Sequence, residues 1–368
     1  MFKGKCWRWL LLLLPVVAFG LWWHQSTTSG PRIVFVAERR GISAIYSMNV
    51  NGCDIRPLTH ADGAMVFPIS LTVSPDGKKI AYSVLGSCPG AIRVMDTDGK
   101  HDHQIAAFNG PRVCIFSADS KTVYSIDLGD HDVFRNSIEG HIEKQYRDCV
   151  AKLVCSPNCR EIYTTGGSDL YRSNVDGSDK KEIVRYGVED IASSPDGNRI
   201  YYKRYDEIYR ADNDGKQVVK LTKYPGLFSN LFPYPQKTYH VLAVSPNGKL
   251  IAYIAEINNH LQIFLMDTNG NHSRLLTHES KRLSNLLFSP DSQMILYTLS
   301  NDEHYSEEDI CTIRIDGSHR KVLTHTIETV ELRDRIKSLL PLPWVNAINF
   351  DSSTGIYAYP CWLPERKR

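Results

Sequence analysis

The chain has 368 residues, of which 42% are hydrophobic and 23% charged, a composition typical of an ordered globular protein rather than a disordered or collagen-like one. Its 43 basic and 41 acidic residues give a net charge of +2 without a basic run, so nucleic acid is not an expected partner. With 24 glycines, 18 prolines and 19 tyrosines and few long helical patterns, the sequence favours one large all-β domain over the two or three domains that length alone would suggest.

The first thirty residues read as a targeting segment. Residues 9–23 are apolar throughout and follow three basic residues. This stretch of about 15 residues is shorter than the roughly 20 that span a bilayer squarely, so it fits a signal peptide or a short signal anchor. Ala18 and Gly20 offer a small-x-small cleavage site, whereas Trp22 and Trp23 resemble an interfacial aromatic belt and favour the anchor. Either interpretation predicts that the rest of the chain is exported.

Beyond residue 30 the sequence repeats with a period near 40 residues. Each unit opens on a turn of the Ser-Pro-Asp-Gly type, in which proline presets φ near −65° at the second position. A short run of β-branched and aromatic residues follows each turn and predicts a strand. The six turns are Ser74–Gly77, Ser117–Ser120, Ser156–Cys159, Ser194–Gly197, Ser245–Gly248 and Ser289–Ser292.

A second turn recurs later in each unit, where an Asp-Gly or Asn-Gly pair predicts a tight hairpin because both residues tolerate positive φ. The fourth strand often ends in Leu-Thr, as at Leu276-Thr277. Four strands in about 40 residues are too few to bury their own faces, and radial stacking of such sheets solves this as a β-propeller. The hairpin pairs are Asn51-Gly52, Asp98-Gly99, Asp176-Gly177, Asp214-Gly215, Asn269-Gly270 and Asp316-Gly317.

These residues carry a resemblance to a known family. The unit Val73–Tyr82 followed by Ile92–Gly99 resembles the WD40-like (PD40) repeats of the TolB propeller family, and residues 241–278 match them as well. The resemblance spans residues 33 to about 360 and implies four-stranded antiparallel blades; the unit at 114–148 departs from it most. Such blades occur both in periplasmic scaffold proteins and in the propeller domains of prolyl-oligopeptidase-type enzymes, so the resemblance specifies the fold and not the function.

The blade count follows from the units. Six have their own opening turn, and a seventh is split, since residues 33–60 lack an inner strand while 347–350 and 356–359 resemble the start of a unit. Pairing of N- and C-terminal strands in one blade would close the ring and remove an open edge. We therefore predict seven blades over residues 31–361 with a tail at 362–368; a six-bladed ring with one irregular blade is the alternative.

The sequence contains few signatures of catalysis or metal binding. It has no Gly-x-Ser-x-Gly elbow, no His-Glu-x-x-His and no phosphate-binding glycine loop, so a non-enzymatic protein without a cofactor is favoured. His60, His278 and His325 each follow Leu-Thr at the same point of the repeat. We expect them to be loop residues and not metal ligands, because rim positions are too far apart for metal bonds of roughly 2 Å.

The cysteines allow disulfide bonds in an exported chain. Of the nine cysteines, all but Cys6 follow the N-terminal segment. Cys155 and Cys159 flank one Ser-Pro-Asp-Gly-type turn and form one candidate pair; Cys88 and Cys114 form another. Buried free thiols are the alternative.

The long irregular connections fall between the second and third strands of a blade or between blades, which places them on one face of the ring. We call this the long-loop face. It would carry the insertion 224–240, the acidic segment 302–309 and the inter-blade insertion 326–343, whose leucines have helical spacing. The candidate partner-binding residues are Tyr224, Phe228, Phe232, Tyr234, Tyr239, His240, Asp302, Glu303, Tyr305, Glu307 and Glu308. The alternative is that these insertions fill a seam between two blades.

These observations lead to a functional expectation. The chain is interpreted as an exported TolB-like propeller of the cell envelope, in the periplasm or on the outer face of the membrane, or as a secreted one. It would be a non-enzymatic scaffold that binds a protein or peptide through its long-loop face, with the membrane contacted through the N-terminal segment. The alternatives are a lyase or hydrolase acting on a peptide or glycan in the central channel, and a propeller that only rigidifies an assembly. Charged residues converging in the channel would favour catalysis.

Overall fold

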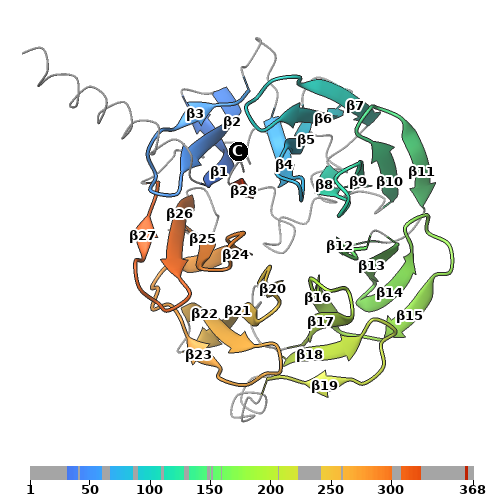
Figure 1. The fold of residues 1–368 in the computed structure, drawn as a ribbon, viewed down its shortest axis with the longest axis vertical. Coiled ribbons are helices and arrows are strands. Elements are labelled where there is room, and N and C mark those ends of the chain that lie inside the picture. Colours follow the sequence, from blue (N-terminus) through green and yellow to red (C-terminus); the bar gives the residue numbers. More distant parts are fainter. Residues whose placement is uncertain are drawn as a thin grey trace, which may run out of the picture.

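The computed structural model describes residues 31–39, 42–59, 67–85, 90–108, 112–127, 132–146, 150, 152–158, 160–205, 207–222, 242–257, 260–300, 308–324 and 361–363. These residues form seven four-stranded antiparallel sheets arranged around a central axis (Figure 1). In that part of the chain, no helix is both long enough and apolar enough to cross a membrane.

We number the blades in chain order and give the strands of each from the channel outwards. Blade 1 consists of β28 (Cys361–Leu363), β1 (Arg32–Arg39), β2 (Ile42–Asn49) and β3 (Arg56–Pro57). Blade 2 consists of β4 (Phe67–Val73), β5 (Lys79–Leu85), β6 (Gly90–Asp96) and β7 (His103–Phe108), and blade 3 of β8 (Arg112–Phe116), β9 (Thr122–Asp127), β10 (Val133–Ser137) and β11 (Ile142–Tyr146). Blade 4 consists of β12 (Lys152–Cys155), β13 (Glu161–Gly166), β14 (Asp169–Asn174) and β15 (Lys181–Val184), and blade 5 of β16 (Val188–Ser193), β17 (Arg199–Arg204), β18 (Glu207–Asp212) and β19 (Val219–Lys220). Blade 6 consists of β20 (Leu242–Val244), β21 (Leu250–Ile257), β22 (His260–Asp267) and β23 (Arg274–Leu275), and blade 7 of β24 (Arg282–Phe288), β25 (Met294–Ser300), β26 (Glu308–Arg314) and β27 (Lys321–Val322).

This architecture confirms the predicted seven-bladed propeller, and the six-bladed alternative is wrong. The predicted closure is also confirmed, because β28 pairs antiparallel with β1 and takes the innermost place in blade 1 (Figure 1). The closing strand is Cys361–Leu363 and thus includes two residues assigned to the tail. The two segments expected to open this blade, 347–350 and 356–359, lie outside the described residues.

The Ser-Pro-Asp-Gly turn is held by its buried serine. In blade 2 the amide of Gly77 donates to the carbonyl oxygen of Ser74 at 2.8 Å, which closes the turn. The hydroxyl of Ser74 donates to Asp76 Oδ1 at 2.7 Å and accepts the amide of Lys79 at 2.9 Å. Blade 3 lacks both the proline and the glycine, yet its turn forms, with Ser120 at φ +62° in the glycine position. The hydroxyl of Ser120 accepts the amide of Asp76 at 3.1 Å and so joins the turns of blades 2 and 3.

In several Asx-Gly hairpins the glycine lies close to the preceding blade. Gly270 has φ +83°, and a Cβ at this position would lie 2.6 Å from the carbonyl oxygen of Leu221 in blade 5. A Cβ at Gly99 would lie 2.5 Å from the carbonyl oxygen of Leu58, and one at Gly52 would lie 2.9 Å from that of Leu323. Glycine is therefore required at these hairpins both by the backbone conformation and by the distance between blades.

The Leu-Thr pairs complete the outer edge of four blades. In blade 6, the amide of Leu276 donates to the carbonyl oxygen of Ile263 at 2.8 Å, and Thr277 Oγ1 accepts the amide of the same isoleucine at 2.9 Å. The threonine side chain thus replaces a backbone acceptor where the short fourth strand ends. The leucine is buried and faces the neighbouring blade.

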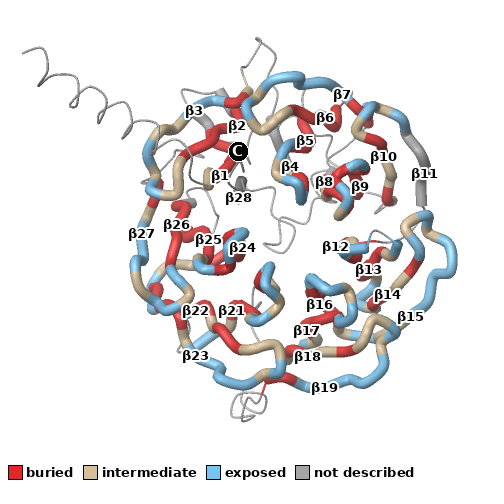
Figure 2. The backbone as a smooth tube through the Cα atoms, viewed as in Figure 1, coloured by how far each residue is buried: buried red, intermediate tan, exposed pale blue. Residues whose placement is uncertain are grey.

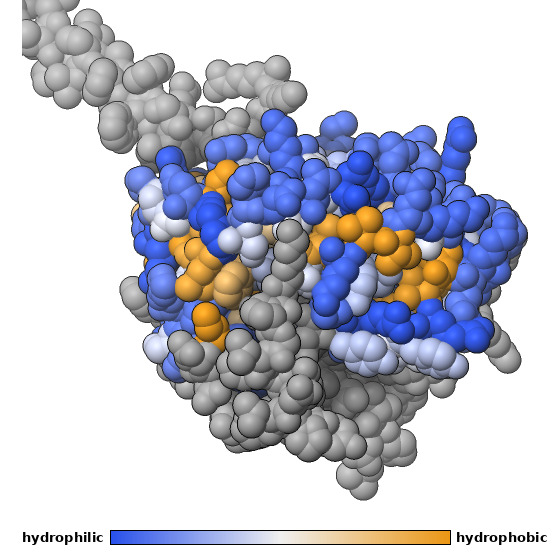
Figure 3. Space-filling view, turned by 90° about the horizontal axis from the view of Figure 1, so that it is seen from below, coloured by the Kyte–Doolittle hydropathy of each residue, from blue (hydrophilic) through white to orange (hydrophobic). Residues whose placement is uncertain are grey.

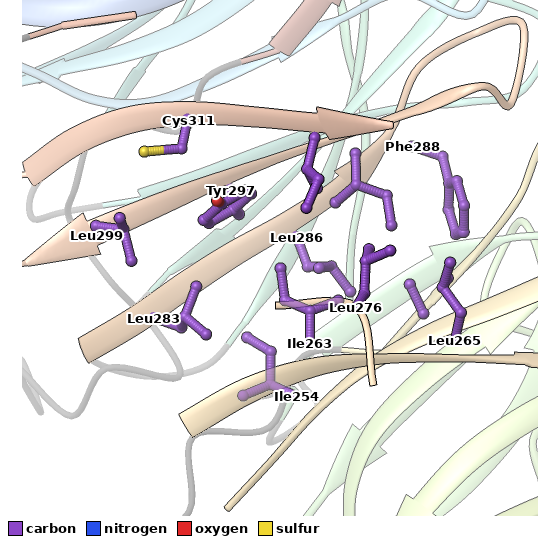
Figure 4. Packing of buried hydrophobic residues seen from close by; sticks show 13 residues of the cluster. Ile254, Ile263, Leu265, Leu276, Leu283, Leu286, Phe288, Tyr297, Leu299 and Cys311 are labelled. Carbon is purple, nitrogen blue, oxygen red and sulfur yellow. The ribbon is translucent and has the colours of Figure 1, made fainter. Parts of the chain in front are cut away.

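The hydrophobic core lies between blades. Buried residues concentrate in the middle strands, while the outermost strands are largely exposed (Figure 2). Each of the seven hydrophobic clusters contains residues of two neighbouring blades, including one that joins blade 7 to blade 1. Between blades 6 and 7, Ile254, Ile263 and Leu265 pack against Leu283 and Leu286 (Figure 4). Seen edge-on, hydrophobic residues lie at mid-height of the disc beneath a hydrophilic layer (Figure 3).

The hairpin glycines give a test of blade spacing. Replacing Gly270 with alanine should lower the free energy of unfolding by more than about 2 kcal/mol, because the new Cβ adds a clash with Leu221 to the cost of a left-handed backbone. Gly167→Ala is the matched control, since Gly167 has φ +58° but a Cβ there would have no atom within 4 Å. In urea unfolding, the free energy of unfolding of the control should fall by only about 1 kcal/mol. Equal losses in the two variants would contradict a role for the contact between blades.

Candidate functional site

The long-loop face is defined by alternation of the connections. In each of blades 2 to 7, the link from first to second strand and the link from third to fourth lie on one face, and the remaining connections lie on the opposite, long-loop face. The insertion residues Tyr224, Phe228, Phe232, Tyr234, Tyr239 and His240, and the acidic-segment residues Asp302, Glu303, Tyr305 and Glu307, lie outside the described residues. Glu308 is the first residue of β26. The binding roles of all eleven residues, and the helix expected in 326–343, stay predictions.

Three inner strands are joined on this face by one buried carboxylate. Asp190 of β16 is 2% exposed and pairs with the ammonium of Lys152 in β12. Its second carboxylate oxygen accepts the amide of Leu242, the first residue of β20, at 2.7 Å. Asp190 therefore connects blades 4, 5 and 6 beside the channel, and these bonds satisfy a charge that would otherwise be costly to bury.

A second carboxylate is placed there by a β-bulge. The register of β16 against β17 shifts between Val188 and Asp190, so Glu189 is the extra residue of the strand. Its carboxylate lies 3.2 Å from the ammonium of Lys203, which is 8% exposed. Burial raises the pKa of Glu189 above its usual value, although Lys203 acts in the opposite direction. Bulges commonly re-aim side chains near functional sites. This inner group of two carboxylates and two lysines is electrically balanced.

An exposed tyrosine pair lies nearby, where blade 4 meets blade 5. Tyr186, in the link from β15 to β16, is 61% exposed, and Tyr205, at the end of β17, is 59% exposed. The ring of Tyr205 lies against the backbone next to Tyr186, because a Cβ at Gly187 would be only 2.6 Å from Cζ of Tyr205. The amide of Tyr205 donates to the carbonyl oxygen of Gly187 at 3.1 Å, and the amide of Tyr186 donates to Asp169 Oδ1 at 2.7 Å. We call Tyr186 and Tyr205 the tyrosine pair.

The backbone of the tyrosine pair is strained. Tyr186 has φ +64° and Tyr205 has φ +53°, in the left-handed region that bulky side chains rarely adopt. Each such residue costs on the order of 1–3 kcal/mol. Two large rings therefore lie in solvent at positions where glycine or asparagine would be more stable. An arginine precedes each ring, with the guanidinium of Arg185 and that of Arg204 each 5.8 Å from the ring centroid that follows.

The link from blade 6 to blade 7 holds a polar cluster around Glu279. Its carboxylate is 7% exposed and accepts two bonds from the guanidinium of Arg320, at 2.6 and 2.8 Å, and one from the hydroxyl of Tyr297 at 2.8 Å. Burial acts to raise the pKa of Glu279, but the bonds from Arg320 and Tyr297 outweigh it and leave that pKa below its usual value. Its backbone is fixed by Gln262, whose side chain bonds to both the amide and the carbonyl of Glu279. Burial raises the pKa of the nearby Cys311 thiol to about 12, so this thiol stays protonated and is a poor nucleophile.

The remaining sequence candidates are partly described. His278 is exposed, while His60 and His325 lie outside the described residues. Cys114 is buried and Cys155 is half-buried, but their candidate partners Cys88 and Cys159 lie outside the described residues, so both disulfide bonds stay predictions. No group of three or more histidine, cysteine or acidic side chains suited to a metal ion occurs within the described ranges.

The sequence interpretation missed both the tyrosine pair and the inner charged group. A signal for the pair existed, because the dipeptide Arg-Tyr occurs at 185–186 and again at 204–205. The inner group left no comparable signal. Lys203 meets Glu189 at a bulge, and Lys152 meets Asp190 through the stacking of blades.

Comparison with known proteins agrees with this geometry. No protein-family model matches the chain, and no curated protein matches its sequence. Among solved structures, TolB from Acinetobacter baumannii is similar over 92% of this chain and 67% of its own, with 18% identity and a TM-score of 0.51. A prolyl endopeptidase structure is similar over 80% of this chain and 50% of its own, with 12% identity and a TM-score of 0.56. An oligogalacturonate lyase in complex with manganese is similar over 80% of this chain and 85% of its own, with 12% identity and a TM-score of 0.55.

These likenesses concern the fold. At such identities a shared propeller is found in scaffolds and enzymes alike. The chain folds as a seven-bladed β-propeller similar to that of TolB.

Glu279 gives a pH-dependent test of the link between blades 6 and 7. Because its folded pKa is lowered, its contribution to stability is present above its usual pKa of 4.5 and is lost as the pH falls through the folded value. The Glu279→Gln substitution should therefore lower the free energy of unfolding by about 1–2 kcal/mol at pH 7. The difference in the free energy of unfolding between the variant and the wild type should narrow as the pH falls below about 4.5. Urea unfolding across this range measures it, with the exposed Glu256→Gln as control. A difference in stability that stayed constant with pH would argue against a contribution from the bonds between the Glu279 carboxylate and Arg320 and Tyr297.

Proposed function

We propose that this chain is an exported propeller scaffold that binds a protein or peptide partner through its long-loop face. The observation that carries the proposal is the tyrosine pair. Tyrosine and arginine are enriched at the centres of protein interfaces, and two exposed tyrosines preceded by arginines have that composition. Strained residues that persist in a rigid scaffold also cluster at functional positions.

The surrounding structure supports a pre-organised binding face. The links that carry the tyrosine pair are short and are bonded to the neighbouring blade through Asp169 and Ser168. Binding therefore requires little ordering of the backbone, which lowers the entropic cost of association. Ile257, at the end of β21, is 40% exposed on the same face one blade further on. The insertion 224–240 enters the chain between these blades, and its aromatic residues belong to the proposed surface.

We propose export from the first thirty residues, with the signal peptide and the anchor both open. Protein partners and a periplasmic or cell-envelope location are what the resemblance to TolB-like propellers implies. The partner-binding role of the acidic segment 302–309 belongs to the same proposal.

An enzyme is the second candidate, a lyase or hydrolase acting on a peptide or glycan in the channel. The observation that favours it is Glu189, a carboxyl of raised pKa that a bulge places beside the buried Lys203. Groups with perturbed pKa values in a channel are candidates for acid–base chemistry. Both carboxylates of the inner group face lysines, and this pairing favours the structural role in a scaffold.

The scaffold proposal is tested by replacing the tyrosine pair with asparagine, which tolerates the left-handed backbone. Recovery of partner proteins from an envelope extract, followed by affinity measurement with the purified partner, should show at least about a 10-fold weakening. The melting temperature should stay the same or rise, because strain is relieved. Val218→Ala with Val219→Ala, on the outer strand edge, is the control and should bind like the wild type.

A Phe228→Ala, Phe232→Ala variant tests the insertion separately. Undiminished partner recovery in both the asparagine and the alanine variants would refute the aromatic face as the binding site.

A further inference from the structure

Arg204 is a cation without a carboxylate partner in the described part of the chain. It is the last residue of β17, and its guanidinium lies 5.8 Å from the centroid of the Tyr205 ring. Its Nε is buried and has no hydrogen-bond partner. Partial burial of a guanidinium costs free energy when its N–H donors have no acceptor. A carboxylate matches the guanidinium in shape and charge and can supply these acceptors.

The acidic groups around Arg204 are already engaged. Glu207, opposite Arg204 in the register of β17 and β18, pairs with Lys220 and accepts the hydroxyl of Tyr209. Glu189 pairs with Lys203, and Glu182 pairs with Arg185 at 2.8 Å. Asp169 accepts the amide of Tyr186 and the hydroxyl of Tyr171, so among the described residues no carboxylate is bonded to Arg204.

The direction of the side chain places that charge at the tyrosine pair. Along a strand alternate residues share a face, so Arg204 is on the side of Tyr202, which packs against blade 4. The link that carries Tyr186 and Gly187 lies on that side, and Gly187 is in contact with the ring of Tyr205. Blades 4 and 5 are neighbours in the ring (Figure 1). The guanidinium of Arg204 and the ring of Tyr205 thus lie beside the link that carries Tyr186.

We propose that this surface recognises an acidic peptide segment, in which an aspartate or glutamate bonds to Arg204 while an adjacent apolar side chain packs on the tyrosine pair. The inference rests on the proposed binding function and names the chemistry of the partner. A peptide fits better than a saccharide because Ile257, an exposed aliphatic residue on the same face, offers packing for a hydrophobic side chain. The charge-assisted bond also gives the surface a specificity that tyrosine rings alone lack.

The test uses the full chain on an array of 12-residue synthetic peptides of randomised sequence. Peptides retained by the wild type should be enriched in aspartate and glutamate next to an apolar residue. Arg204→Gln should bind the acidic peptides about 10-fold more weakly, and Arg204→Lys should recover part of the loss. Binding by the wild type should weaken with added salt, while binding by Arg204→Gln should depend less on salt. Arg160→Gln, on the opposite face, is the matched control and should behave like the wild type.

The outcomes separate this inference from the proposed function. The acidic-peptide inference would be overturned if the peptides retained through the tyrosine pair were not enriched in acidic residues. It would also be overturned if Arg204→Gln kept the wild-type preference for acidic peptides. Either result would leave the scaffold proposal standing. Retention that does not depend on the tyrosine pair would overturn both. Tyrosine-dependent binding of polygalacturonate, without acidic peptides, would replace the peptide with an anionic saccharide.

Discussion

Each blade buries its hydrophobic faces against the two blades beside it, and every other feature of the molecule depends on this contact. A four-stranded sheet of about 40 residues has no core of its own. The seven hydrophobic clusters accordingly join pairs of neighbouring blades around a closed ring. The hairpin glycines show how close the contact is, because at Gly99 and Gly270 there is no room for a side chain between one blade and the outer strand of the preceding one. A ring of this kind is stable only when its last interface is made, and blade 1 makes it from both ends of the chain.

The same contact creates the proposed binding face. The link from blade 4 to blade 5 carries Tyr186 and bonds to Tyr205 at the end of β17, and Asp190 joins the inner strands through bonds to Lys152 and Leu242. The backbone strain at Tyr186 and Tyr205 is sustained by this rigid surrounding. Arg204 adds a guanidinium whose Nε is buried without a hydrogen-bond partner and which lies 5.8 Å from the Tyr205 ring centroid. Shape, strain and charge thus coincide at one junction of the long-loop face.

The repeated elements could be predicted from the sequence because their signals are local. The serine of Ser-Pro-Asp-Gly and the glycine of Asx-Gly are required by the turn itself, and even Ser120 adopts the glycine conformation where the pattern fails. A C-terminal strand that closes blade 1 was predicted, but its position was not. The three residues Cys361–Leu363 are too few to show a strand pattern in the sequence. The inner charged group and the tyrosine pair could not be read directly, since they arise from a bulge and from blade stacking that link residues far apart in sequence. The predicted insertions at 224–240 and 302–307 lie outside the described residues.

Closure of the ring by β1 and β28 is the central claim, and removal of the closing strand tests it most directly. A chain truncated after Pro360 lacks β28 and leaves the inner edge of β1 without that partner. The melting temperature of the truncated chain should fall by about 5 °C or more, and amide exchange should accelerate first in β1 and in the interface of blades 7 and 1. An unchanged melting temperature together with unchanged protection of the β1 amides would contradict the claim.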